Sequence, residues 1–576
     1  MDCVEQQVAT SVLVIGTGGA ALRAAIELAE RGIDVLVVGK RPMADAHTTL
    51  ARGGVNAALA TMDPDDSWQQ HAADTLTESC LLADPVTVRI VTEGAAEAIR
   101  DLERYGMAFA RERDGRISQR FFGAHTHRRT AYAGDHTGLE LHRTLVHRAL
   151  ELAVPVMDSV YITSLLVRDA VIFGAYGFDV CDGTRYTIHS DSVILATGGH
   201  ARIWRRTSSR RGENTGDSFR LAHEAGARIR DAELVQFHPT GLIQPEEWAG
   251  TLVPDIARAE GGILRNALGD RFMRRYDSER MELSSSNQVA VAADTEIRAG
   301  RGTPRGGVWL DLTHLPRTHI LDRLPRLYQS LLDVQSLDIT TDPIEVAPAA
   351  HYSMGGVWVR ADDHSTDVAG LYVIGAASTG MHGAGVLGGN PLIELLVYGK
   401  IAARAAARYS IGLGAQQRSR SAVSDARDAI AGLLSSPGSE NAHYLHRAVR
   451  ATMTRHAGVV RDEAGLRAGL DEIDDIESLT PRLAVHPDIA GFVELAEAFD
   501  LRSALSAGRA TLETALQRRE TRGCHNRSDC PPADESLRVN LVWSGPGRVA
   551  AEPVPDIPGD IAALMRPVST IGKLLE

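Results

Sequence analysis

The stretch Val12-Leu-Val-Ile-Gly-Thr-Gly-Gly-Ala-Ala-Leu-Arg-Ala-Ala25 decides the fold of this chain. An apolar, β-branched run ends in glycines and passes directly into a helical pattern rich in Ala and Leu. A second apolar run, Asp34-Val-Leu-Val-Val38, follows the helix. A strand, a tight glycine turn, a helix and a second strand in this order predict a dinucleotide-binding βαβ unit. We therefore expect an α/β fold built on a Rossmann-like domain.

Each small residue of the turn has a distinct physical task. Gly16 allows the sharp bend, Gly18 lets the backbone approach a pyrophosphate, and Ala21 lets the helix pack closely on the strand. The first turn of the helix presents free amides and the positive end of its dipole to the phosphates. We expect Gly16, Gly18, Gly19 and Ala20 to contact the nucleotide.

Composition and length exclude several classes of protein. The chain has 576 residues, which suggests roughly two to four domains. A net charge of −13 argues against non-specific binding to nucleic acid. The five cysteines are scattered without a C-x-x-C pair, which fits a reducing cytoplasm and predicts no zinc or iron–sulfur ligands on this chain. The sequence contains neither a leader-like start nor an apolar run long enough to span a membrane.

The strand-plus-glycine pattern recurs at Ser192–Gly199 and Gly370–Gly375. Between them, residues of about 233–350 show a different pattern, with loops, prolines, charged turns and short helices. This arrangement predicts a nucleotide-binding domain interrupted by an inserted α+β capping domain, with a ligand cleft between the two. We expect helices over about 66–107, 139–152, 392–409 and 426–518, and strands over 160–167, 171–178 and 186–189. The predicted domains are a nucleotide domain of 1–232 plus 351–410, a capping domain of 233–350, a linker of 411–425, a C-terminal helical domain of 426–535 and a Pro/Gly-rich tail of 536–576.

The ordered motifs resemble a known family. The chain is similar to the flavoprotein subunits of succinate dehydrogenase and fumarate reductase, a family that includes L-aspartate oxidase. The resemblance runs from about residue 11 to 530. Besides the first glycine turn, the matching segments are Ala46–Gly54, Gly134–Gly138, Ala196–Gly199, Thr215–Asp217, Gln236–Gly241, Arg258–Gly262, Thr303–Gly307, His351–Gly356 and Arg519–Gly523.

This resemblance implies FAD as the cofactor. His47 falls where the respiratory members attach the flavin covalently, so a covalent link at His47 is one expectation. A plain loop histidine is the alternative. The other positions that the resemblance assigns to cofactor binding are Lys40, Thr48, Gly53, Gly54, Thr197, Gly198, Asp217, Ala376, Asn390 and Leu392.

The resemblance also implies the acid–base and substrate-binding residues. Two family histidines that help to bind the substrate correspond to His238 and His351. Arg258 matches a family arginine near the active site, and Asp255 stands where relatives carry a glutamate. We expect these four residues to orient a small organic acid and to handle its protons.

Several positions depart from the family pattern. The proton-delivering arginine is replaced by Ser286, and the arginine that clamps a substrate carboxylate is replaced by Val386. Pro254 replaces a threonine, and Ala376 replaces a glutamate whose carboxylate contacts the FAD. A neutral hydroxyl cannot relay a proton as the family arginine does, and the loss of a bidentate clamp weakens carboxylate binding by a few kcal/mol.

Two functional hypotheses remain open. One is an FAD-dependent oxidoreductase acting on a C–C or C–N bond of a small organic acid other than plain succinate, fumarate or aspartate. The other is a degenerate flavoprotein with a binding or assembly role; amine oxidation like that of L-aspartate oxidase is a further variant. Ordinary succinate or fumarate chemistry would need a guanidinium from elsewhere, and Arg265 and Arg301 are the candidates by position. A separate iron–sulfur or electron-acceptor subunit is an expected partner, although the short tail favours a protein without a membrane complex.

Overall fold

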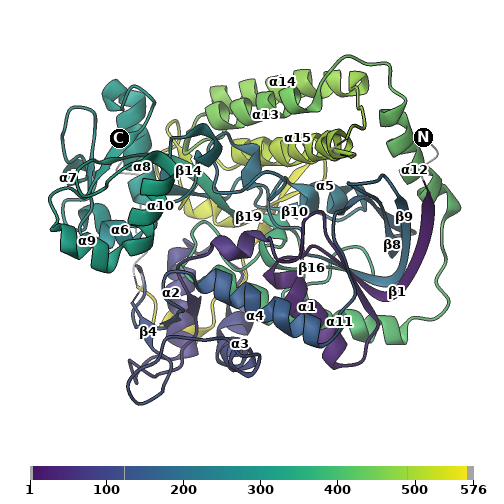
Figure 1. Cartoon of the computed structure of the whole chain (residues 1–576), viewed down its shortest axis with the longest axis horizontal. Helices are drawn as coiled ribbons and strands as arrows, with labels where there is room; N and C mark the ends of the chain where they lie inside the picture. The colour runs from purple at the N-terminus through teal and green to yellow at the C-terminus, as the bar shows by residue number, and fades with distance from the viewer. Residues whose placement is uncertain (1–3, 122, 490, 567–576) are drawn as a thin grey trace.

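The computed structural model describes residues 4–121, 123–489 and 491–566, and is centred on one mixed sheet (Figure 1). The strand order is β6-β2-β1-β9-β8-β7, and β16 pairs with β9 outside this path. Strand β1 (Glu5–Ile15) runs parallel to β2 (Val35–Val38) and to β9 (Arg185–Leu195). Strand β16 (Leu371–Val373) is also parallel to β9, so the late segment returns to the nucleotide domain, as predicted.

The predicted βαβ unit is confirmed. Helix α1 (Gly19–Glu30) follows a turn in which Gly16 has φ = +123°. A Cβ atom at Gly16 would lie 2.3 Å from the carbonyl oxygen of Ala196, so glycine is required there both by φ and by space. Strand β1 starts earlier than the sequence indicated, because its polar first half pairs with β9 from Glu5 onward.

Helices and a β-meander build the rest of the nucleotide domain. Helices α2 (Trp68–Glu78), α3 (Pro85–Arg104) and α4 (Thr137–Glu151) confirm the predicted helical segments. Asp84 caps α3, since its carboxylate accepts the backbone N–H groups of residues 86 and 87. Strands β6 (Val156–Met157), β7 (Val160–Arg168) and β8 (Val171–Asp179) precede β9, which joins two segments that the sequence pattern separated.

The capping domain is an antiparallel sheet with its own core, and it lies at one end of the molecule (Figure 1). Its strands, in the order β11-β14-β13-β12, are Val235–Leu242, Ile344–Ser353, Val308–Asp311 and Ile263–Arg265. Helices α6 (Ile256–Ala259), α7 (Met273–Tyr276), α8 (Ser286–Glu296), α9 (Arg317–Arg323) and α10 (Pro325–Gln335) belong to this domain. Strand β14 crosses the predicted border at residue 350.

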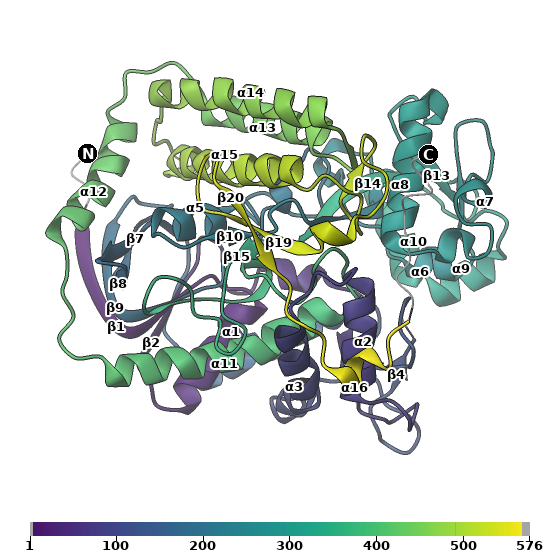
Figure 2. The same cartoon turned by 180° about the vertical axis from the view of Figure 1, so that it is seen from behind.

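The C-terminal helices α13 (Ala442–His456), α14 (Glu463–Leu479) and α15 (Val493–Gln517) form a separate layer over the nucleotide domain (Figures 1 and 2). Helix α12 (Arg420–Leu434) lies apart from this layer, beside strands β7 and β8. The predicted linker of 411–425 was too long. Helix α11 (Asn390–Gly412) extends into the first residues of the predicted linker. Helix α12 begins before the predicted linker ends, and the side chain of Ser419 caps it by accepting the N–H of Ala422.

The predicted tail contains regular structure, which the sequence pattern did not indicate. Strands β19 (Val539–Trp543) and β20 (Val549–Pro553) form a hairpin, and β19 pairs with β10 (Ile229–Arg230), which pairs with β15 (Gly356–Val357). The side chain of Trp543 is buried, and its indole N–H donates to Glu513. The glycines and prolines lie in the turn of the hairpin or at its ends, so they do not interrupt the strand pairing. Helix α16 (Gly559–Ala562) then lies against α2 (Figure 2).

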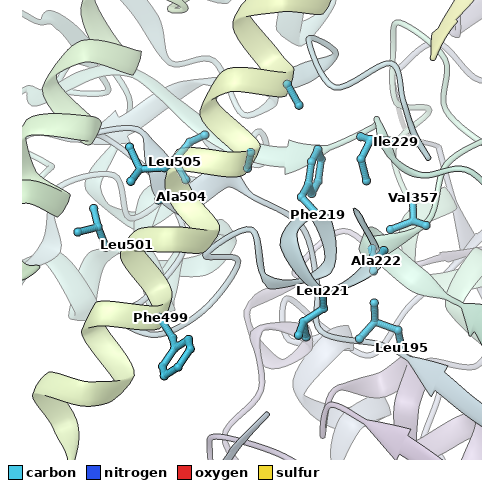
Figure 3. Packing of buried hydrophobic residues seen from close by; sticks show 14 of the residues in the cluster. Leu195, Phe219, Leu221, Ala222, Ile229, Val357, Phe499, Leu501, Ala504 and Leu505 are labelled. Carbon is cyan, nitrogen blue, oxygen red and sulfur yellow. The ribbon is translucent and has the colours of Figure 1, made fainter. Parts of the chain in front are cut away.

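Apolar packing fixes the helical layer to the nucleotide domain (Figure 3). Leu501, Ala504 and Leu505 of α15 belong to the same buried cluster as Phe219 and Leu221 of α5 (Asp217–Glu224). Each fully buried leucine or phenylalanine side chain contributes about 1.5–3 kcal/mol to stability. This packing holds the first residue of α5, Asp217, at the wall of the cavity described next.

Candidate active site

One cavity of about 1100 Å³ joins the nucleotide turn to the capping domain. Its lining comes from the β1–α1 turn, the loop after β2, the start of α11, strands β11 and β14, and the start of α8. This volume lies just above the usual range for pockets that bind a single small ligand, so it has room for a dinucleotide and a small acid together. The cleft predicted between the two domains is therefore present.

The nucleotide end of the cavity suits a pyrophosphate. Gly16, Gly18, Gly19 and Ala20 all line it. Gly18 is the extended N-cap of α1, with no side-chain cap and no acidic residue in the first helical turn. Thr48, also in the lining, accepts the N–H of Gly19 at 3.1 Å. The turn thus offers amides and a positive dipole end with no competing carboxylate.

The strand ends that face the cavity also fit FAD. Thr197 and Gly198 line it after β9, and Gly53 and Gly54 line it from the loop after η1 (His47–Leu50). The hydroxyl oxygen of Thr197 is buried without a hydrogen-bond partner in the described part of the chain. A buried polar atom of this kind is satisfied when a polar ligand binds beside it.

Lys40 and Asp217 meet in a buried cluster that lines the cavity. The ammonium of Lys40 donates to Asp217 at 2.7 Å and to Asp500 at 2.9 Å, and the hydroxyl of Tyr161 donates to both carboxylates. Burial raises the pKa of Asp217, but Lys40 outweighs burial and lowers that pKa to about 2. Sequence reasoning missed Asp500 and Tyr161 because they come from α15 and β7, far along the chain.

His47 lies at a half-exposed edge of the cavity. Its Nδ1 is 3.1 Å from a carboxylate oxygen of Glu213, and its side chain is 28% exposed. Burial raises the pKa of Glu213, but His47 and Arg210 outweigh burial and lower that pKa to about 2. The carboxylate therefore orients the imidazole. A covalent flavin link at His47 stays a prediction.

The last three residues that the resemblance assigns to the cofactor, Ala376, Asn390 and Leu392, do not all face the cavity. Ala376 and Leu392 line the cavity. Asn390 lies behind it, with its side-chain oxygen 2.8 Å from the Nε2 of His71 and 2.8 Å from the Nδ2 of Asn56. Asn390 is thus placed to hold the glycine loop against α2 rather than to face a ligand.

The four predicted catalytic residues are brought together on the capping-domain side. His238 on β11 and His351 on β14 lie edge to face, with ring centroids 5.9 Å apart. One oxygen of Asp255 is 2.9 Å from the Nε2 of His238 and 2.6 Å from a guanidinium nitrogen of Arg258. Arg258 is anchored further by the carbonyl of Glu282 at 2.6 Å.

Charge and hydrogen bonding fix the protonation of this group. Burial raises the pKa of Asp255, but Arg258 and His238 outweigh burial and hold that pKa well below its usual range. The backbone N–H of Thr240 donates to the Nδ1 of His238, so Nε2 carries the proton that points to Asp255. Burial lowers the pKa of His351 to about 3, so this imidazole is neutral at pH 7.

The family departures also lie in the cavity wall. Pro254, Ser286 and Val386 line it. Arg265 and Arg301 are not part of the described lining, because they pair with Asp311 at 3.0 Å and Glu296 at 2.8 Å. The suggestion that either arginine replaces a lost clamp is therefore wrong. Further arginines do line the cavity, which sequence reasoning missed: Arg41, Arg52, Arg120, Arg210, Arg280, Arg323 and Arg566.

Comparison with known proteins defines the class. Residues 11–392 match the family described as FAD binding domain, and residues 446–555 match the one described as fumarate reductase flavoprotein C-term. The chain belongs to the FAD-dependent oxidoreductase family of succinate dehydrogenase and fumarate reductase flavoprotein subunits.

Relatives and solved structures agree with this assignment. One chain of the fumarate reductase (CoM/CoB) of Methanothermobacter marburgensis is 39% identical over 92% of this chain and 96% of its own length. The succinate dehydrogenase flavoprotein subunit of Rickettsia bellii is 34% identical over 93% of this chain and 92% of its own. The apo Sdh1 complex of Mycobacterium smegmatis contains a chain of 35% identity, with a TM-score of 0.90 and 97% coverage of both chains. Within the described residues, no helix is long and apolar enough to cross a membrane.

Proposed function

We propose that this protein moves two electrons and two protons across a C–C or C–N bond of a small organic acid that is not plain succinate, fumarate or aspartate. The observation that carries the proposal is the intact array of His238, Asp255 and Arg258 in a cavity where Ser286 and Val386 replace the family's arginines. Acid–base and orienting groups remain, whereas the guanidinium groups that match a dicarboxylate are gone from those positions.

The chain's own residues support binding and proton handling. Bound FAD supplies the hydride chemistry. Asp255 stays ionised at pH 7, so it orients the N–H of His238 and does not donate a proton itself. The Nδ1 of His351 is 2.8 Å from the hydroxyl of Ser208, and its Nε2 makes no hydrogen bond within the described residues. That free nitrogen of a neutral imidazole is the group available to exchange a proton with the substrate.

The start of α8 supports the binding of one carboxylate. Residues 284–288, which include the N-cap Ser285, line the cavity. The amides and hydroxyls at this helix start are donors, and the helix dipole favours an anion there. These donors suit one carboxylate of the substrate.

The proposal also covers the electron acceptor, the cellular location of the protein and the attachment of the flavin. We expect a separate electron-acceptor subunit or an iron–sulfur partner, a cytoplasmic location, and a flavin linked covalently through His47. His47 is partly exposed at the cavity edge, which leaves it reachable. In-gel flavin fluorescence after denaturation tests the covalent link, and a dark band refutes it.

Absorbance spectroscopy of the purified protein tests the main proposal. We expect a flavin band that bleaches anaerobically with a member of a panel of small acids, and near-zero succinate oxidation with an artificial acceptor. Turnover of succinate at many per second would refute the substrate claim. A colourless protein would instead support the binding or assembly role.

A further inference from the structure

Glu78 is a cavity-lining carboxylate that the mechanism above does not use. It is the last residue of α2 and is half-buried. In the described part of the chain, neither a hydrogen bond nor an ion pair reaches its carboxylate. Burial raises the pKa of Glu78 to about 7, against the opposing charge of Arg280. Arg280 also lines the cavity, but it is exposed and acts on Glu78 only through its charge.

The backbone fixes where this carboxylate lies. A Cβ atom built on Gly385 would be 3.7 Å from the Cγ of Glu78 and 2.2 Å from its backbone oxygen. Gly385 therefore lets the loop before α11 sit directly on the end of α2. The Cγ of Glu78 thus lies against Gly385, the residue before Val386, which takes the position of the family's carboxylate-binding arginine.

One side of Glu78 is apolar. Cys80, Leu82 and Val386 belong to one hydrophobic cluster, and Cys80 and Val386 also line the cavity. A carboxylate in such a corner is costly unless it gains a partner. A second carboxylate arriving there would meet the like charge of Glu78, which the exposed Arg280 offsets only in part, whereas an ammonium group would form a charge-assisted hydrogen bond.

We propose that Glu78 is a specificity residue that binds an ammonium group at one end of the substrate, while the donors at the start of α8 hold the carboxylate at the other end. The substrate class is then a small amino acid in which the two charged groups are separated along the carbon chain. This inference rests on the proposed function and narrows its substrate class.

Isothermal titration calorimetry on the FAD-loaded, full-length protein tests the inference with a matched ligand set. The ligands are 4-aminobutanoate, butanoate and succinate, which share one carboxylate and differ at the other end. We expect 4-aminobutanoate to bind about tenfold tighter than butanoate, and succinate to bind most weakly. In Glu78→Gln the preference for the amine should disappear while butanoate binds within about twofold of wild type. Glu247→Gln is the matched control, since Glu247 is exposed at the same cavity and should leave the preference intact.

The outcomes separate the two proposals. If butanoate and 4-aminobutanoate bind equally to wild type, or if Glu78→Gln keeps the preference, the inference about Glu78 is overturned and the proposed function stands. If none of the three acids binds to flavin-loaded protein, the inference about Glu78 is overturned; the proposed function fails separately, if no acid of the wider panel bleaches the flavin band. The wild-type comparison decides even if the Glu78→Gln variant does not fold.

Discussion

Replacing Asp255 with Asn removes the charge that joins His238 to Arg258. The same oxygen accepts from both partners, at 2.9 Å and 2.6 Å. Asn keeps an acceptor but loses the charge, and a hydrogen bond to a charged group is worth about 1 kcal/mol more than a neutral one. Two such bonds give a loss of about 2 kcal/mol. The full cost of about 3–5 kcal/mol for breaking a buried ion pair does not apply, because the Asp255 side chain is 36% exposed while that of Arg258 is 4% exposed.

The free energy of unfolding, measured by urea titration with circular dichroism at pH 7, checks this prediction. We expect the unfolding midpoint of Asp255→Asn to fall by an amount equivalent to about 2 kcal/mol. The control is Asp114→Asn, whose partner Arg116 is 57% exposed; the loss of this surface pair should leave the unfolding midpoint close to that of the wild type. If the two variants lose the same stability, the charge of Asp255 does not organise the site and the reasoning is refuted.

Three further predictions concern the cofactor, the pH dependence and the substrate. Gly16→Ala should release FAD on desalting, because its Cβ would clash with backbone, whereas Gly32→Ala, with open space around it, should retain FAD; equal flavin absorbance in both would contradict this. In the folded protein the pKa of His351 is lowered to about 3, so as the pH falls the imidazole takes up a proton in the unfolded chain before it does so in the folded one. The free energy of unfolding should therefore fall as the pH drops from about 6.5 towards 3. His351→Gln should show a weaker decline in unfolding free energy over that window, and parallel curves would argue against a neutral buried imidazole. Ser286→Arg combined with Val386→Arg should tighten succinate binding about tenfold by calorimetry, and unchanged affinity would reject the alignment of these positions with the family arginines.

Much of the fold could be predicted from short-range sequence patterns. The glycine turn and α1 follow from residues that are close together in sequence, because a βαβ unit is specified locally. The hairpin of β19 and β20 could not be predicted, because Gly and Pro residues surround its short strands and are typical of irregular structure. In addition, Trp543 of β19 contacts α15, which is distant in sequence. The linker was overestimated for a related reason, because the cap at Ser419 outweighs the polar composition around it.

The candidate site was predicted in part. His238, Asp255, Arg258 and His351 were named from motifs, and the structure brings them within contact of one another or of a shared neighbour. Asn390 was assigned to the cofactor by resemblance, yet its side chain lies in a network behind the cavity wall. A motif identifies a residue type at a position, but side-chain direction depends on the elements that pack around it.

The sequence by itself determined the nucleotide turn, the family, and the loss of two arginines at Ser286 and Val386. These features are properties of residue identity and short spacing. Only the tertiary structure decided that Arg265 and Arg301 are committed to carboxylates elsewhere, and that Glu78 from α2 faces the same cavity as Val386. The physical reason is that charge complementarity depends on distance in space, and segments hundreds of residues apart supply the two sides of one cavity.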